Sequence, residues 1–198
     1  RVRSSAASDV YKRQVVGQPA AVIAAGRAAN LAVRAAADAP ELFTSVVLVS
    51  PYALAGMNLD PTAGQALARA AQRASLGLVP YAVLTTRPAL RRVRATRTAH
   101  GDDAEAREAA IAHLYASAHQ FGGHHALLAL LTGELDLPMQ NALALMEPPA
   151  LILSGEVDAL HPREEMEDLA IISPHTDLEV IPGAGEAVME DQPAAFVE

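Results

Sequence analysis

Two short apolar runs on either side of an alanine-rich segment constrain the fold more than any other feature. The runs cover residues 20–25 and 45–50, and glycine or proline bounds them, as is typical of buried strands. Residues 27–38 between them are mostly alanine and leucine, which favour helix. Strand, helix and strand at this spacing predict a βαβ unit with parallel strands and a right-handed crossover.

The middle of the chain, residues 53–147, has a different character, because no strand-like alternation occurs in it. Asp60 and Pro61 form a good helix start, and helical patterns are predicted at about 62–76, 78–98, 103–118 and 123–132. After the prolines at 148–149, strands are predicted at 150–154 and 178–181, with a helix at 163–171. The whole pattern predicts an α/β fold: a parallel sheet with a helical cap or lid inserted into it.

Composition excludes several classes of protein. The formal net charge of −8 argues against a nucleic-acid partner, because phosphate binding needs a positive surface. The chain has no cysteine, which excludes disulfides, thiolate metal sites and a cysteine nucleophile. No apolar run reaches the roughly 20 residues that cross a bilayer. We therefore expect a soluble cytoplasmic protein without a membrane partner. The sequence indicates no cofactor and no metal, and leaves the oligomeric state open.

The two ends of the chain suggest a fragment. Residues 1–14 carry a serine cluster and Lys12, the only lysine in the chain, and they lack the apolar core of a signal peptide. They are predicted to be a non-native tail. The final residues, DQPAAFVE, should start a helix, and the chain stops inside it. We accordingly expect strands to be missing in front of residue 15.

Three stretches resemble the α/β-hydrolase superfamily. ELFTSVVLVSP resembles the strand after the catalytic elbow, GEVDALHP resembles the turn that carries the acid, and VIPGAGEAVMEDQPAAF resembles the last strand and turn. The resemblance covers most of residues 15–52 and 148–198, which we assign to the hydrolase core. Residues 53–147 fit a helical cap by position. The first strands, with the loop that supplies half of the oxyanion hole in the family, would be missing.

The resemblance implies a catalytic triad with two positions altered. Asp158 occupies the acid position, where the family uses a carboxylate to orient a histidine. The elbow reads Ala24 to Ala28, with Gly26 where a serine is expected, so the nucleophile is absent. Glu186 stands where the histidine base is expected. An ordinary glutamate is too weakly basic to activate a serine at neutral pH.

Other interpretations of these residues remain open. The simpler interpretation of Gly26 is an ordinary turn glycine, and Asp158 without a histidine is an exposed loop acid or a helix cap. If Asp158 and Glu186 were adjacent, they could share a proton, and the pair could activate water or hold a cation. Arg27 could offer a charge to an anion, although a solvated arginine is the simpler expectation. The remaining candidates are interpreted as strand-end serines, structural or surface histidines and a mutually paired charged face: Ser50, Ser154, His113, His119, His124, His125, His161, Arg87, Arg91, Arg92, Arg94, Arg97, Asp102, Asp103, Glu105 and Glu108.

Three functional hypotheses follow from the sequence. The first is a degenerate hydrolase that keeps its pocket and binds a small apolar ligand. The second is an active hydrolase, of ester type or related, with a non-standard constellation that includes Asp158 and Glu186. The third is a non-catalytic scaffold or interaction module that keeps only the fold. The vacated nucleophile and base positions favour the first.

Overall fold

The computed structural model describes residues 17–52, 78–99, 104–125 and 138–197. The chain divides into two compact units, the first comprising Arg1–Ala55, Arg97–Ala99 and Leu137–Glu198 and the second Gly56–Thr96 and His100–Asp136. The predicted tail 1–14, the predicted helix 62–76 and most of the predicted helix 123–132 lie outside the described residues.

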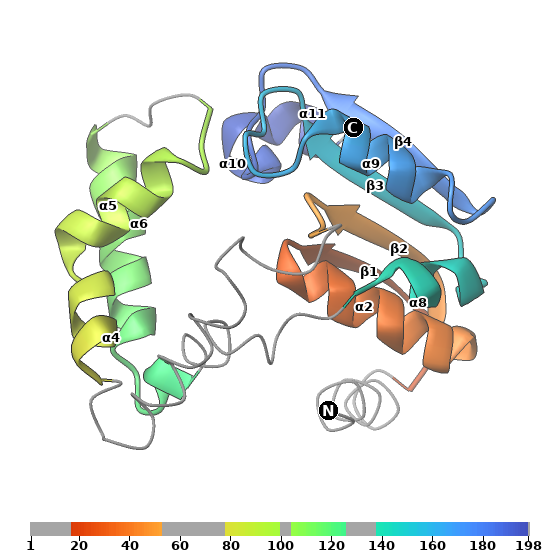
Figure 1. Ribbon diagram of the computed structural model, residues 1–198, viewed down its shortest axis with the longest axis horizontal. Coiled ribbons are helices and arrows are strands. Elements are labelled where there is room, and N and C mark those ends of the chain that lie inside the picture. The colour runs from red at the N-terminus through yellow and green to blue at the C-terminus, as the bar shows by residue number, and fades with distance from the viewer. Residues whose placement is uncertain (1–16, 53–77, 100–103, 126–137, 198) are drawn as a thin grey trace, which may run out of the picture. The chain divides into compact units, whose positions relative to one another are not determined.

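The first unit is built on a four-stranded parallel sheet (Figure 1). Its strands lie in chain order, β1-β2-β3-β4, and every neighbouring pair is parallel. Strands β1, β2 and β3 are mostly apolar, as expected for a sheet covered on both faces, whereas β4 also carries Asp177 and Glu179. The predicted α/β fold with a parallel sheet is confirmed, and the strands span Ala20–Ala25 (β1), Phe43–Val49 (β2), Ala150–Gly155 (β3) and Thr176–Ile181 (β4).

Helices cover both faces of this sheet. Helix α2 follows β1 over the predicted range, and the predicted helix after β3 is present as α9. Helices α2, α8 and α9 pack with one face of the sheet, whereas α10 and α11 pack with the other. The helix at 140–145 and the one at 188–191 were not expected from the sequence. The bounds are Arg27–Asp38 (α2), Pro40–Leu42 (η2), Gln140–Leu145 (α8), Arg163–Ala170 (α9), Val188–Asp191 (α10) and Pro193–Val197 (α11).

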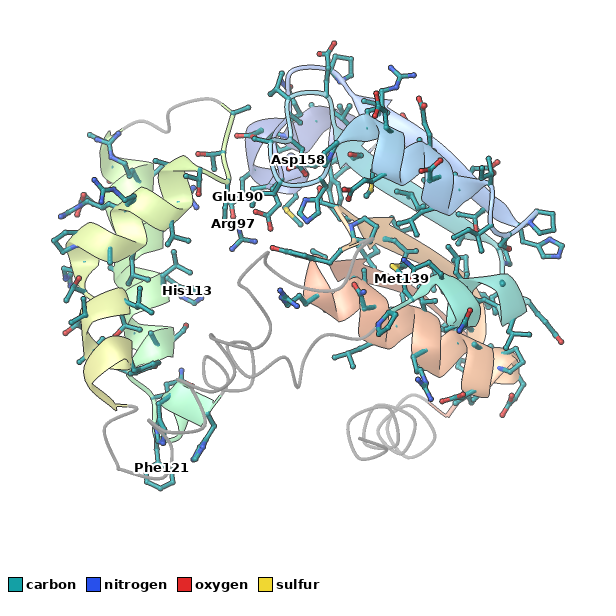
Figure 2. The ribbon with its side chains drawn as sticks, viewed as in Figure 1. Arg97, His113, Phe121, Met139, Asp158 and Glu190 are labelled. Atoms are coloured by element: carbon teal, nitrogen blue, oxygen red, sulfur yellow. The ribbon has the colours of Figure 1, made fainter. Side chains whose placement is uncertain are left out.

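The described part of the second unit is helical, with α4 (Leu78–Leu84), α5 (Arg87–Ala95) and α6 (Ala104–Ala118). The expectation of one helix over 78–98 is wrong, because the chain breaks at Thr86, which is extended. Pro88 explains the break, since it lies in the first turn of α5 and cannot donate the backbone hydrogen bond that a continuous helix needs. Phe121, after α6, is fully exposed (Figure 2). Among the described residues, no helix has the length and apolar character to cross a membrane.

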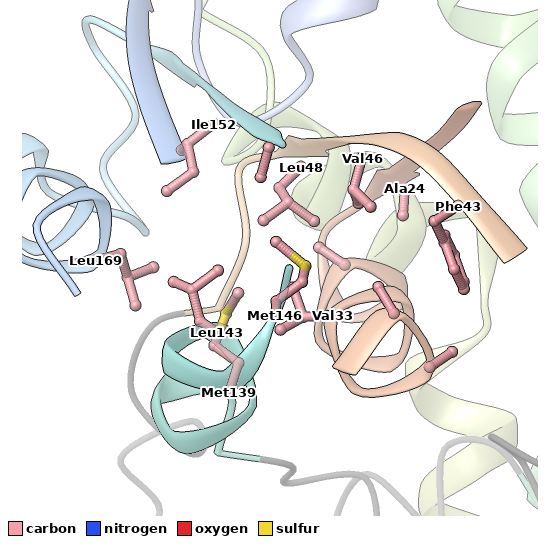
Figure 3. Close-up of a cluster of buried hydrophobic side chains, with 14 of the residues drawn as sticks. Ala24, Val33, Phe43, Val46, Leu48, Met139, Leu143, Met146, Ile152 and Leu169 are labelled. Carbon is pink, nitrogen blue, oxygen red and sulfur yellow. The ribbon is translucent and has the colours of Figure 1, made fainter. Parts of the chain in front are cut away.

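The larger hydrophobic core lies between the sheet and helices α2, α8 and α9 (Figure 3). Alternate residues of the strands, such as Val46 and Leu48 on β2, are fully buried there. Met139, Leu143 and Met166 fill the space on the helical side, each completely buried. Unbranched methionines suit this irregular gap because they adopt many shapes. This packing holds the strands in register, and therefore sets where their carboxyl ends, and the candidate site, must lie.

Candidate active site

Gly26 forms the turn between β1 and α2 and adopts a conformation that suits glycine. Its φ is 57° and its ψ is −129°, a region that residues with a side chain rarely enter. Its backbone N–H donates to the carbonyl oxygen of Val49 at 2.8 Å, which ties the turn to the end of β2. A Cβ added here would lie 3.6 Å from Cε2 of Tyr52, an ordinary contact. The sharp, strained strand-to-helix turn is thus present, without a side-chain oxygen.

Asp158 lies in the turn after β3 and is buried (labelled in Figure 2). Its Oδ1 accepts the backbone N–H groups of Leu160 at 2.9 Å and His161 at 3.1 Å, and its Oδ2 is bonded to Nδ1 of His161 at 2.9 Å. Burial alone would raise the pKa of the Asp158 carboxyl, but the hydrogen bonds and charge of His161 outweigh it and hold that pKa below its ordinary value. The expectation of an exposed loop acid is therefore wrong.

His161 is the partner that the sequence did not predict for Asp158. The side chains of His161 and Asp158 are only 2% and 1% exposed, so the hydrogen bond between them is shielded from water. The other ring nitrogen, Nε2, is buried and has no hydrogen-bond partner among the described residues. The ring also meets the ring of Tyr52 edge to face, with 4.4 Å between centroids. His161 was interpreted as a structural or surface histidine, and the three-residue spacing from Asp158 was its only local signal.

Glu186, at the predicted base position, is held by Arg97. Nε and Nη2 of Arg97 donate to the two carboxylate oxygens at 2.7 and 2.8 Å, and the Glu186 side chain is only 3% exposed. Burial alone would lower the pKa of Arg97, but the hydrogen bonds to Glu186 outweigh it and raise that pKa. Of the interactions that the structure describes, none joins Glu186 to Asp158. Because each carboxylate has its own partner, the structure does not support a proton shared between Asp158 and Glu186.

The backbone reinforces the contact between Arg97 and the turn that carries Glu186. Residues Arg97–Ala99 belong to the same compact unit as the sheet. The carbonyl oxygen of Arg97 accepts the N–H of Ala187 at 3.1 Å, and the N–H of Ala99 donates to Oδ2 of Asp191 at 2.8 Å. The same oxygen of Asp191 accepts the N–H of Gly185 at 2.8 Å. The turn after β4 is therefore bound to the 97–99 segment by side chains and backbone together.

Tyr52 is close to several of these groups, although nothing in the sequence singled it out. The guanidinium of Arg27 lies over its ring, 4.5 Å from the centroid, and the ring of His161 meets it edge to face. Burial and the negative charge of Glu186 raise the pKa of the Tyr52 hydroxyl, and the positive charges of Arg97 and Arg27 offset part of this rise. The turn at Gly26 and the Asp158–His161 pair thus lie next to one aromatic ring, and the charges of Arg97 and Glu186 act on its hydroxyl.

Two serines of the sheet and two histidines of the second unit were also candidates. Ser50 and Ser154 are buried at the ends of β2 and β3, and neither hydroxyl has a hydrogen-bond partner among the described residues. Ser50 also has a positive φ of 43°, which is strained for a serine. His124 and His125 lie in the second unit with their rings 4.0 Å apart between centroids. In the described part of the chain, no group of three or more histidine and carboxylate side chains could hold a metal ion.

A model of the alpha/beta hydrolase family matches residues 3–198. The chain belongs to this family. No curated protein matches the chain closely enough to count as a relative.

Solved structures of alpha/beta hydrolases share the fold. An esterase from Exiguobacterium antarcticum gives a TM-score of 0.71 at 12% identity, with 97% of this chain and 69% of the other covered. A thermophilic esterase from Thermogutta terrifontis gives 0.65 at 18%, with 96% and 66% covered. A 2-hydroxy-6-oxo-6-phenylhexa-2,4-dienoate hydrolase from a Rhodococcus species gives 0.66 at 14%, with 91% and 62% covered. This hydrolase-family chain spans about two thirds of the length of these structures.

Proposed function

We propose that this alpha/beta hydrolase binds a small molecule at the carboxyl ends of its strands and forms no acyl-enzyme. The observation that carries the proposal is Gly26, whose backbone keeps the strained turn of a nucleophile elbow without any oxygen to attack a substrate. Family membership alone would suggest covalent hydrolysis, but that chemistry needs a nucleophile at this turn.

The state of Glu186 supports the same proposal. A general base needs a free lone pair directed at the proton that it removes. Both oxygens of Glu186 instead accept hydrogen bonds from Arg97, and the side chain is nearly buried. Glu186 would have to break two charge-assisted hydrogen bonds before it could act on a substrate. We therefore assign it a structural role.

The side chains around Tyr52 suggest what kind of molecule would bind. A purely apolar ligand was the expectation from the sequence. The Tyr52 ring instead meets the charged or polar groups of Arg27 and His161, and the charges of Glu186, Arg97 and Asp158 act on its hydroxyl. We propose a ligand that combines an apolar or aromatic body with a polar oxygen group, because binding sites use a few polar groups to orient a mainly apolar molecule. We further propose that the helical residues inserted between β2 and β3 form a cap domain.

A probe experiment on the full chain tests the absence of covalent chemistry. A fluorophosphonate probe should label no serine, and p-nitrophenyl esters should give no burst of product, since neither reaction has a nucleophile at residue 26. The Gly26→Ser variant is the matched control, because it restores the hydroxyl at the elbow. Labelling of a serine in the wild-type protein would contradict the proposal.

Ligand binding needs a separate measurement. Thermal unfolding with a panel of small aromatic and aliphatic acids and esters should reveal compounds that raise the melting temperature, because a ligand that binds only the folded state stabilises it by mass action. The shift should shrink in the Tyr52→Ala variant. If no compound of the panel stabilises the protein, the scaffold hypothesis replaces the binding hypothesis.

A further inference from the structure

Asp158 has a histidine partner, but not at the position where the sequence led us to expect one. The expected position holds Glu186, which is bonded to Arg97, and Oδ2 of Asp158 is bonded to Nδ1 of His161 at 2.9 Å. We propose that His161 is the working histidine of this site, and that its Nε2 activates a water molecule for the non-covalent hydrolysis of a small ester. This activity goes beyond the ligand binding proposed above.

The hydrogen bond from Asp158 determines what Nε2 can do. An ionised carboxylate only accepts hydrogen bonds, so Nδ1 of His161 must carry the proton that joins the two side chains. In the neutral imidazole, Nε2 then bears the lone pair and acts as an acceptor or base. A group that binds at Nε2 must therefore donate a hydrogen bond, and water does so. The same orientation of a histidine by an aspartate underlies general-base catalysis in hydrolases.

The surroundings of Nε2 favour a functional interpretation over a purely structural one. A buried polar atom without a partner is costly, and such atoms are rare unless they serve a function or hold water. Nε2 of His161 is buried and has no partner among the described residues, and the same is true of the hydroxyls of Ser50 and Ser154. The N–H of Ser50 donates to the carbonyl oxygen of Leu153, so the two serines lie at the ends of adjacent strands. Three buried polar groups of this part of the fold thus lack a hydrogen-bond partner among the described residues.

The vacated elbow and this histidine both lie next to one aromatic ring, that of Tyr52. The ring of Tyr52 meets the ring of His161, and a Cβ at Gly26 would also touch it. Helix α2, 12 residues long, begins directly after Gly26. The N–H groups of its first turn and its positive dipole end can stabilise negative charge on a carbonyl oxygen there. Tyr52 is therefore next to both the water-activating group and the place where an ester carbonyl would be polarised, and in the proposed reaction its ring turns aside to let the water and the carbonyl meet.

The reaction balances without another reactant. Nε2 takes a proton from water while the water oxygen bonds to the ester carbonyl carbon, and the carbonyl electrons move onto its oxygen. When the tetrahedral intermediate collapses, the bond to the leaving alkoxide breaks, and Nε2 returns the proton to the alkoxide. The products are one carboxylic acid and one alcohol, and His161 is regenerated. No bond to the protein forms, which agrees with the lack of a nucleophile at Gly26.

The test uses the full chain and p-nitrophenyl acetate. The wild-type protein should release p-nitrophenol faster than buffer, without a burst, and mass spectrometry after an acid quench should detect no acetyl-protein. His161→Gln should lower kcat/KM by about 10²-fold, the usual contribution of a positioned general base. Asp158→Asn should cause a loss of at least about tenfold, because Nδ1–H loses its acceptor. The matched control is His175→Gln, since His175 is an exposed histidine of the same unit.

Two further variants keep the proposal open to refutation. Tyr52→Ala should raise the rate because it clears the approach to Nε2, whereas Tyr52→Phe keeps the ring and should not. If His161→Gln does not fold, the rates of the wild-type protein and of Tyr52→Ala test the proposal instead. A wild-type rate equal to that of buffer, a His161→Gln variant as active as the wild type, or an acetylated protein would each overturn the proposal. Stabilisation by a ligand in the thermal assay is independent of these results, so the proposed binding function could survive this failure.

Discussion

The ion pair between Arg97 and Glu186 should stabilise the fold far more than an exposed pair of the same geometry. Replacing Arg97 alone leaves a carboxylate that is only 3% exposed without its cation. Breaking a fully buried pair costs about 3–5 kcal/mol, and because the Arg97 side chain is 48% exposed, water recovers part of that loss. We therefore expect Arg97→Met to reduce the free energy of unfolding by about 2–3 kcal/mol.

The chain supplies its own control. Arg91 and Glu108 form a bidentate pair with distances of 3.0 and 2.8 Å, but their side chains are 44% and 47% exposed. Exposed pairs contribute about 0–1 kcal/mol. Double-mutant cycles with Arg→Met and Glu→Gln at each pair, measured by urea unfolding, should give a coupling energy of about 2 kcal/mol for Arg97–Glu186 and below about 1 kcal/mol for the control. Equal coupling energies would refute the argument from burial.

Three other predictions concern the same unit. Gly26→Ala should lower the free energy of unfolding, measured in urea, by about 1–2 kcal/mol. A positive φ costs a residue with a side chain about 1–3 kcal/mol, and the lower entropy of the unfolded chain returns part of this cost. An unchanged free energy of unfolding would contradict the strained turn. Gly155→Ala should prevent stable folding, seen as lost circular dichroism at room temperature, because its Cβ would overlap the carbonyl oxygens of residues 184–185. Asp158 has a lowered pKa, so its contribution to stability is complete above its ordinary value of 3.8 and is lost as the pH falls through its folded pKa. The Asp158→Asn variant should not show this loss of stability at acid pH. If the wild-type protein and the variant lost stability identically as the pH falls, the result would argue against the bond to His161.

Local sequence patterns were enough to predict the scaffold. Strand β1, helix α2 and strand β2 appear where the apolar run, the alanine-rich segment and the second apolar run predicted them, within two residues. Such elements depend on the periodicity and propensity of neighbouring residues, which the sequence shows directly. The error at 78–98 has a local cause as well, because Pro88 could have been interpreted as the break that separates α4 from α5.

The site was predictable only in part. The positions of Gly26, Asp158 and Glu186 came from motifs, and the strained turn at Gly26 agrees with its predicted place between strand and helix. The partners of the two carboxylates did not follow from motifs. Arg97 is 89 residues from Glu186, and it was assigned to a solvated charged face because acidic residues follow it closely in the chain.

What the sequence determined by itself is the four strands of the described sheet, the helices after β1 and β3, and the glycine at residue 26, since these depend on residue types and their spacing. The tertiary structure alone decided which side chains face each other: Asp158 with His161, Glu186 with Arg97, and Tyr52 with His161. The physical reason is that hydrogen bonds and ion pairs act over a few ångströms, and only the packing of the sheet and its turns brings distant residues within that range.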